Sequence, residues 1–120
     1  MAQTANSRRE PPADVFATID RDHLARMTFG DCNLERELLQ LFDRQATMLL
    51  VRIRAGAPAA VKPLAHTLKG SASGIGAGGV ARAAEAVECA APADCSAAVD
   101  HLAQAVDEAR ALIAELLRTG

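Results

Sequence analysis

The stretch HTLKGSASGIGAGG, His66–Gly79, decides between two folds for this chain of 120 residues. Its second half matches the pattern G-x-G-x-x-G, which in nucleotide-binding proteins follows a β-strand and cradles phosphate groups. The residues before it, VKPLAHTLKG (61–70), have helical spacing and few β-branched residues, and no second β-α-β unit follows. We therefore interpret the glycines as a turn between two antiparallel helices, with Gly76 supplying a positive φ where the first helix ends.

The spacing of apolar residues outside this stretch predicts an all-α protein. Four segments repeat apolar positions every three or four residues, and a short helix precedes them: 31–56, a third helix that ends at about 73, about 77–91, and 94 onward. Pro58 suits the beginning of the third helix, but Pro63 implies that this helix either bends or starts near Val61. Short connections between long helices predict an up-down-up-down four-helix bundle with a short additional N-terminal helix. Residues 1–12 are expected to form a disordered tail and residues 13–120 one domain. The expected helix caps are Asp14 or Asp20, Asp31 or Asn33, and Asp94. The residues at helical spacing in the first two helices are Ile19, His23, Leu24, Met27, Leu34, Leu38, Leu41, Phe42, Gln45, Met48, Leu49 and Ile53.

The composition argues against several classes of function. The net charge is −2, aromatic residues make up 2% of the chain, and Trp and Tyr are absent, so nucleic-acid binding is not expected. Apolar runs are far shorter than the roughly 20 residues that span a bilayer. The first residues contain no apolar segment typical of a signal peptide, so we expect a cytoplasmic protein without membrane attachment.

The three cysteines do not form a recognisable metal-binding pattern. Cys32, Cys89 and Cys95 are an odd number in a chain without a secretion signal, which favours reduced thiols. Cys89, Cys95 and His101 lack the spacing of a zinc site and a fourth ligand. We expect no metal site.

His66 is predicted to lie on the exposed side of its helix. At about 100° per residue, the apolar residues of this segment share one arc, and His66 lies about 155° from its centre. Lys62, Lys69 and Ser73 fall on the same outer side. Gly70, which follows Lys69, costs about 1 kcal/mol in a helix relative to Ala, so a reason other than helix stability is expected for it.

A carboxylate is predicted to face His66 from the next helix. A turn centred near residue 77 places Glu88 level with His66, and Glu85, one turn away, is the alternative. A carboxylate that accepts the Nδ1 hydrogen leaves Nε2 free as a nucleophile. These residue types suit capture of a phosphoryl group by His66, with Lys69 offsetting the added negative charge.

The segments AHTLKGSASGIGA (65–77) and ARAAEAVE (81–88) resemble the histidine-containing phosphotransfer (HPt) domains of bacterial two-component phosphorelays. The resemblance implies that His66 is phosphorylated, that Lys69 and Gly70 support the phosphoryl group and its approach, and that Glu88 orients the imidazole. It also implies a four-helix bundle. The implied partner surface consists of Lys62, Ser73, Phe29 and Leu34.

The resemblance also implies what the protein exchanges phosphate with. The partners would be response-regulator receiver domains, a hybrid sensor histidine kinase, or both. The receiver would supply Mg²⁺, so no cofactor is expected on this chain. Because no ATP-binding lobe is recognisable, the protein would be a phosphocarrier without autokinase or ATPase activity.

Three alternatives come from other functional classes. The first is a helical adaptor that binds receiver domains without carrying phosphate. The second is a dimeric phosphotransferase in which each subunit contributes one helical hairpin; four long helices in one chain favour a monomer instead. The third is an enzyme that uses His66 as a general base, which lacks a second convergent catalytic group.

Overall fold

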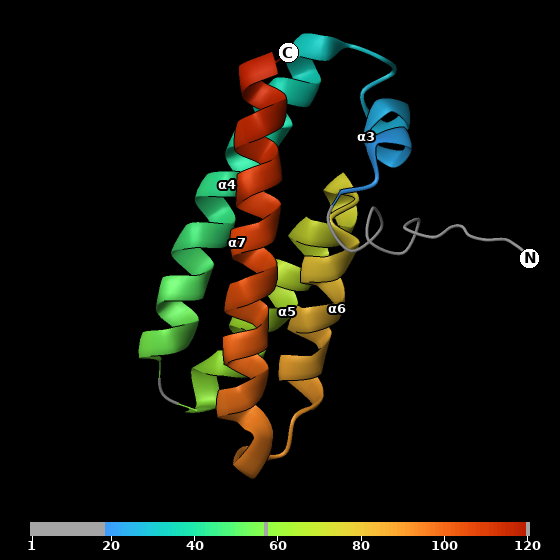
Figure 1. Ribbon diagram of the computed structural model, residues 1–120. Helices are drawn as coiled ribbons and strands as arrows, with labels where there is room; N and C mark the ends of the chain where they lie inside the picture. Colours follow the sequence, from blue (N-terminus) through green and yellow to red (C-terminus); the bar gives the residue numbers. More distant parts are fainter. Residues whose placement is uncertain (1–18, 57, 120) are drawn as a thin grey trace, which may run out of the picture.

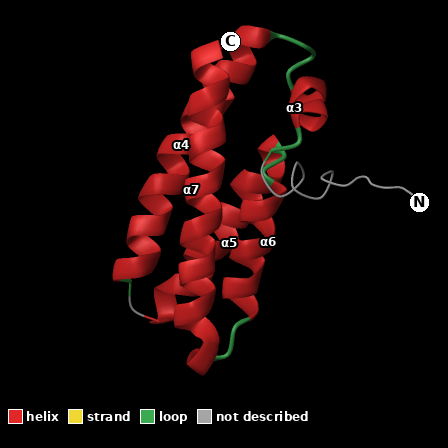
Figure 2. Ribbon diagram, viewed as in Figure 1, coloured by secondary structure: helices red, strands yellow, loops and turns green. Residues whose placement is uncertain are grey.

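The computed structural model describes residues 19–56 and 58–119, and every regular element in them is helical (Figures 1 and 2). The predicted all-α class is confirmed. The predicted tail, residues 1–12, and the candidate cap Asp14 lie outside the described residues. The elements are α3 (Arg21–Met27), α4 (Cys32–Ala55), α5 (Pro58–Ile75), α6 (Gly78–Cys89), a 3-10 turn (Pro92–Asp94) and α7 (Cys95–Thr119).

Among the four longer helices of the described chain, each packs against the next one in sequence, and the last packs against the first. Helix α4 packs against α5 and α7, and α6 packs against the same two helices. In Figure 1 consecutive helices of this set run in opposite directions, while the short α3 lies beside the upper ends of α5 and α6. The arrangement leaves the outer faces of α5 and α6 side by side.

Aspartate side chains begin two of the helices. Oδ1 of Asp20 accepts a hydrogen bond from the backbone N–H of His23 at 3.0 Å, and Oδ1 of Asp31 accepts one from Leu34 at 3.1 Å. Each satisfies a backbone donor that the first turn of a helix leaves without a partner. Asp94, predicted to cap the last helix, instead lies inside the 3-10 turn that leads into α7.

Helix α5 continues through Pro63 without interruption. It begins at Pro58, so the sequence-based alternative in which it starts near Val61 is wrong. Pro63 has no N–H to donate to the preceding turn, yet the packing of α5 against α4 and α6 holds the helix together. The backbone carbonyl of Pro63 accepts a hydrogen bond from the hydroxyl group of Thr67, one turn later, at 3.1 Å.

The core is an interface of small and medium aliphatic side chains. Helix α5 buries the arc predicted from its sequence, and only Leu64 in that arc is half-buried. The fully or nearly fully buried residues of α5, α6 and α7 are Val61, Ala65, Leu68, Ala72, Ile75, Val80, Ala83, Ala84, Val87, Leu102, Val106, Ala109 and Ile113.

Helix α4 buries only part of its apolar spacing. Leu34, Leu41 and Met48, which fall at helical spacing in the sequence, are 37%, 43% and 53% exposed, whereas Leu39 is 4% exposed. The helix carries apolar residues over more of its circumference than its two neighbours cover. The spacing of seven residues keeps the three exposed side chains on one face, which we call the α4 apolar stripe.

The turn between α5 and α6 is fixed by Gly76. Its φ is +82°, the left-handed region that glycine adopts without strain, as predicted. Its carbonyl accepts a hydrogen bond from the backbone N–H of Asp20 at 2.7 Å, and Nε2 of His23 lies 3.1 Å from the carbonyl oxygen of Gly74. The segment that begins α3 is therefore anchored to the end of α5.

We expect Gly76→Ala to lower the free energy of unfolding by about 1–3 kcal/mol, because the positive φ becomes strained. The added Cβ would also lie 2.9 Å from the carbonyl oxygen of Asp20. Gly70→Ala is the matched control: there a Cβ meets no atom of the described residues within 4 Å, and we expect stability to rise by about 1 kcal/mol. Urea unfolding measures both, and equal effects of the two changes would contradict this account of the turn.

Candidate functional site

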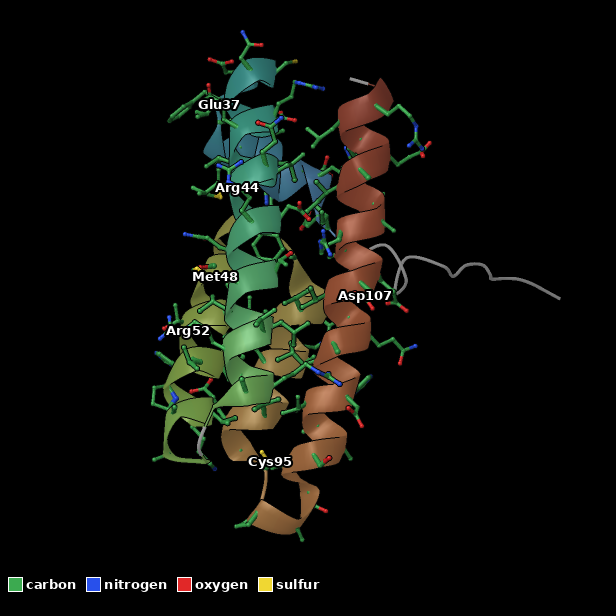
Figure 3. The ribbon with its side chains drawn as sticks, turned by 90° about the vertical axis from the view of Figure 1, so that its left-hand side faces the viewer. Glu37, Arg44, Met48, Arg52, Cys95 and Asp107 are labelled. Atoms are coloured by element: carbon green, nitrogen blue, oxygen red, sulfur yellow. The ribbon has the colours of Figure 1, made fainter. Side chains whose placement is uncertain are left out.

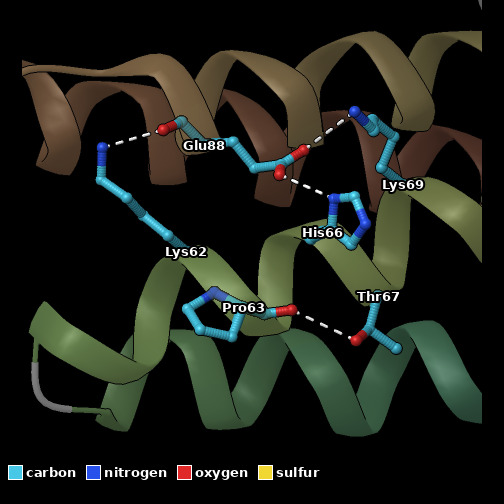
Figure 4. Close-up of polar contacts among 6 residues, drawn as sticks. All are labelled: Lys62, Pro63, His66, Thr67, Lys69 and Glu88. Carbon is cyan, nitrogen blue, oxygen red and sulfur yellow. Dashed lines mark hydrogen bonds and ion pairs between the residues drawn. The ribbon is translucent and has the colours of Figure 1, made fainter.

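His66 presents an exposed imidazole in the middle of α5, and α6 supplies its partner (Figure 4). The side chain is 68% exposed, and its Nδ1 lies 2.8 Å from Oε2 of Glu88. An ionised carboxylate can only accept, so Nδ1 carries the hydrogen and donates it. In the neutral imidazole this leaves a lone pair on Nε2, the other ring nitrogen.

Glu88 also contacts Lys69, the lysine one turn after His66 on α5. Oε1 of Glu88 lies 3.1 Å from Nζ of Lys69. Oε1 is buried and accepts no hydrogen bond of good geometry within the described residues, so this contact is an ion pair rather than a directed hydrogen bond. One carboxylate thus joins His66 and Lys69, which are three residues apart on α5 and share a face.

The charges of this group support one another. The contact with Glu88 raises the pKa of Lys69 above its ordinary value, against a smaller opposing effect of desolvation. Desolvation alone would raise the pKa of Glu88, but the contacts with Lys69 and His66 together outweigh it and hold that pKa below its ordinary value. At neutral pH Lys69 is therefore a cation and Glu88 an anion.

Gly70 leaves the backbone open beside these groups. It is exposed, and a Cβ built on it would meet no atom of the described residues within 4 Å. No packing within the described chain therefore accounts for a glycine in this helix. Open space on the outer side of α5 is what an approaching macromolecule requires.

Lys62 makes contacts that the sequence did not indicate. Its Nζ donates a hydrogen bond to the backbone carbonyl of Glu88 at 2.8 Å (Figure 4) and another to that of Ala90 at 3.1 Å. Lys62 precedes His66 by four residues, so both side chains leave the same face of α5. The last turn of α6 has no basic residue of its own, and this is the feature of the sequence that points to a cation from another helix.

The remaining predicted site residues do not contact His66. Glu88 rather than Glu85 contacts His66; Glu85 is exposed and acts on Lys69 only through its charge. Ser73 is exposed on α5. Phe29, in the turn before α4, is 95% exposed and has a φ of +53°, which is unusual for a residue other than glycine. Leu34 begins the α4 apolar stripe.

Two further features concern metals and membranes. Among residues 19–56 and 58–119, no three His, Cys, Asp or Glu side chains gather closely enough to hold a metal ion. Within the same ranges, no helix has the length and apolar character needed to cross a bilayer. All three cysteines are free thiols; Cys95 is half-buried, and Cys32 and Cys89 are exposed.

The lowered pKa of Glu88 predicts how the stability of the protein depends on pH. A carboxylate whose folded-state pKa lies below the unfolded value stabilises the fold fully above the ordinary value of 4.5, and this contribution disappears as the pH falls through the folded pKa. We therefore expect the difference in thermal midpoint between the wild type and Glu88→Gln to be present at neutral pH and to vanish at strongly acidic pH. Glu85→Gln is the control and should show a much smaller pH-dependent difference. An equal difference in thermal midpoint between the wild type and Glu88→Gln at neutral and strongly acidic pH would contradict the ionic contacts of Glu88.

Comparison with known proteins assigns the family. The model of the Hpt domain family matches residues 36–116, which is more than half of the chain and includes His66, Lys69, Gly70 and Glu88. Searches of curated proteins and of solved structures gave no significant match. The exposed imidazole paired with a carboxylate from the following helix lies inside the matched range. The chain therefore belongs to the Hpt domain family, whose members are phosphocarriers that act in phosphorelays.

Proposed function

We propose that this protein accepts a phosphoryl group on Nε2 of His66 from the aspartate of one receiver domain and passes it to another. The observation that carries the proposal is the contact of 2.8 Å between Nδ1 of His66 and Glu88 on a ring that remains 68% exposed. The contact fixes the orientation and tautomer of the imidazole, and the exposure lets a second protein reach Nε2. A histidine serving only the fold would need neither.

The transfer step follows from this arrangement. The lone pair of Nε2 attacks the phosphorus of the receiver's aspartyl phosphate, a P–N bond forms, and the aspartate carboxylate leaves with the electrons of the broken P–O bond. The ring becomes an N-phosphorylated imidazolium that keeps its hydrogen on Nδ1. Glu88, already ionised and hydrogen-bonded there, stabilises this positive charge. The reverse reaction delivers the phosphoryl group to the second receiver.

Lys69 supplies a cation on the same face. Its side chain is 31% exposed, one helical turn from His66, and its raised pKa keeps it charged. A phosphoryl group adds roughly 1.5–2 negative charges near neutral pH. The ammonium group of Lys69 offsets part of that charge, in addition to its ion pair with Glu88.

The family and the described residues support further parts of the proposal. The four longer helices act as an up-down-up-down bundle in a monomer, and the protein works in the cytoplasm as a carrier. Catalytic Mg²⁺ belongs to the receiver, and phosphate enters from a phosphorylated receiver or hybrid sensor kinase rather than from ATP.

The receiver is expected to dock over the outer side of α5 and the adjoining face of α4. Gly70 and Ser73 are exposed on α5, and the α4 apolar stripe offers a surface that the other helices leave uncovered. The stripe lies about 150° around α4 from Asp43, which forms an ion pair with Arg110 of α7. Figure 3 shows Met48 of the stripe among the charged residues Glu37, Arg44 and Arg52 along α4. Phe29 and Leu34 extend this proposed surface toward the start of α4.

We expect His66→Gln to abolish phosphorylation by a labelled receiver domain, because no nucleophile remains on α5 at that position. The wild type should carry an acid-labile, base-stable label. His101→Gln, which changes an exposed histidine of α7, is the matched control and should be labelled like the wild type. Label retained by His66→Gln would refute His66 as the acceptor. Binding of receivers by a folded wild type that takes up no label from any of them would favour the adaptor.

The open backbone at Gly70 should matter for a protein donor of phosphate but not for a small one. We expect Gly70→Leu to slow transfer from a receiver by about tenfold or more, since a bulky side chain beside His66 displaces the incoming aspartyl phosphate. Phosphorylation by phosphoramidate, a small donor, should change little. Gly70→Ala should lie between Gly70→Leu and the wild type. Equal slowing with both donors would mean that the substitution disturbs His66 itself rather than the approach of the receiver.

A further inference from the structure

Glu88 orients His66 from an unfavourable position in its own helix. It is the penultimate residue of α6, which has only 12 residues and ends at Cys89. The last carbonyls of a helix lack intrahelical donors, and terminal turns open more readily than the interior. A carboxylate in such a turn holds its position only if the backbone beneath it is fixed.

Helix α6 does not stabilise this end with its own side chains. Its last turn contains no basic residue, and the only backbone hydrogen bond given by the C-cap residue Ala90 runs to Val87. Lys62 of α5 supplies what is missing. Its ammonium group donates to the carbonyls of Glu88 and Ala90, and it places a positive charge at the negative end of the helix dipole.

Three side chains from one face of α5 therefore converge on a single residue of α6. Lys62 holds the backbone of Glu88, while His66 and Lys69 contact its two carboxylate oxygens. We propose that Lys62 is a positioning residue for phosphotransfer: it fixes the last turn of α6 and thereby keeps the carboxylate of Glu88 on Nδ1 of His66. The proposal rests on the proposed function of His66.

This role differs from the one predicted from the sequence, in which Lys62 contacts the receiver. Lys62 is exposed, but its ammonium group already donates to two carbonyls of this chain. A contact with a receiver would act on binding and change KM. Positioning of Glu88 acts on the reactivity of bound His66 and changes kcat.

The test compares Lys62→Met with Lys62→Arg. Methionine keeps much of the length and removes the donor, whereas arginine offers several donors to the same carbonyls. Arg82→Met is the matched control, because it removes one positive charge from the exposed surface of α6. All variants are examined as the full chain.

The first measurement needs no receiver. Nitrogen-15 NMR of the His66 ring reports which nitrogen carries the hydrogen, and amide exchange reports the opening of residues 86–90. We expect Lys62→Met to weaken the preference for the Nδ1–H form and to speed amide exchange about fivefold or more, because the variant loses both hydrogen bonds to the end of α6. Lys62→Arg and Arg82→Met should resemble the wild type.

The second measurement is transfer from a phosphorylated receiver. We expect kcat to fall about fivefold in Lys62→Met with KM unchanged, and Lys62→Arg to restore it. A rise in KM alone, unchanged His66 signals in Lys62→Met, or failure of arginine to restore the His66 signals would each overturn the proposal. If the wild type takes up no phosphate, the proposed function fails, while the NMR comparison still decides whether Lys62 holds Glu88 on His66.

Discussion

The candidate site depends on one carboxylate, that of Glu88, which lies between the imidazole of His66 and the ammonium group of Lys69. The carboxylate comes from α6 and the two nitrogen groups from α5, so the site exists only when these helices are packed in the correct register. Three features of the α5–α6 hairpin contribute to that register. The left-handed Gly76 sets the turn, small residues such as Ala72 and Ala84 allow close approach, and Lys62 fixes the far end of α6.

The sequence was most informative where helical geometry alone decides the outcome. The all-α class, the outward direction of His66 and its level with Glu88 follow from about 100° of rotation per residue and one turn at a glycine. The position of His66 and its level with Glu88 depend only on residue spacing within the α5–α6 hairpin. The family match over residues 36–116 includes the motif around His66.

Features that depend on the other helices were harder to predict. The apolar spacing of α4 could not distinguish side chains covered by α5 and α7 from the α4 apolar stripe, because both are rich in leucine. Lys62 was predicted only as part of the exposed partner surface, because its acceptors are backbone carbonyls, which no residue type reveals. Aspartate is a common helix cap, so Asp94 was predicted to cap the last helix. Pro92 instead begins a 3-10 turn that includes Asp94.

Under the proposed function, the net charge of His66, Lys69 and Glu88 depends on whether His66 carries a phosphoryl group. With a neutral imidazole, the cation and the carboxylate cancel, and a partner meets a site without net charge. In the proposed transfer, phosphorylation of His66 would add roughly two negative charges and one imidazolium positive charge, so these three side chains would together carry about one negative charge. The proposed receiver would then meet a different electrostatic field at the phosphorylated carrier than at the unphosphorylated one.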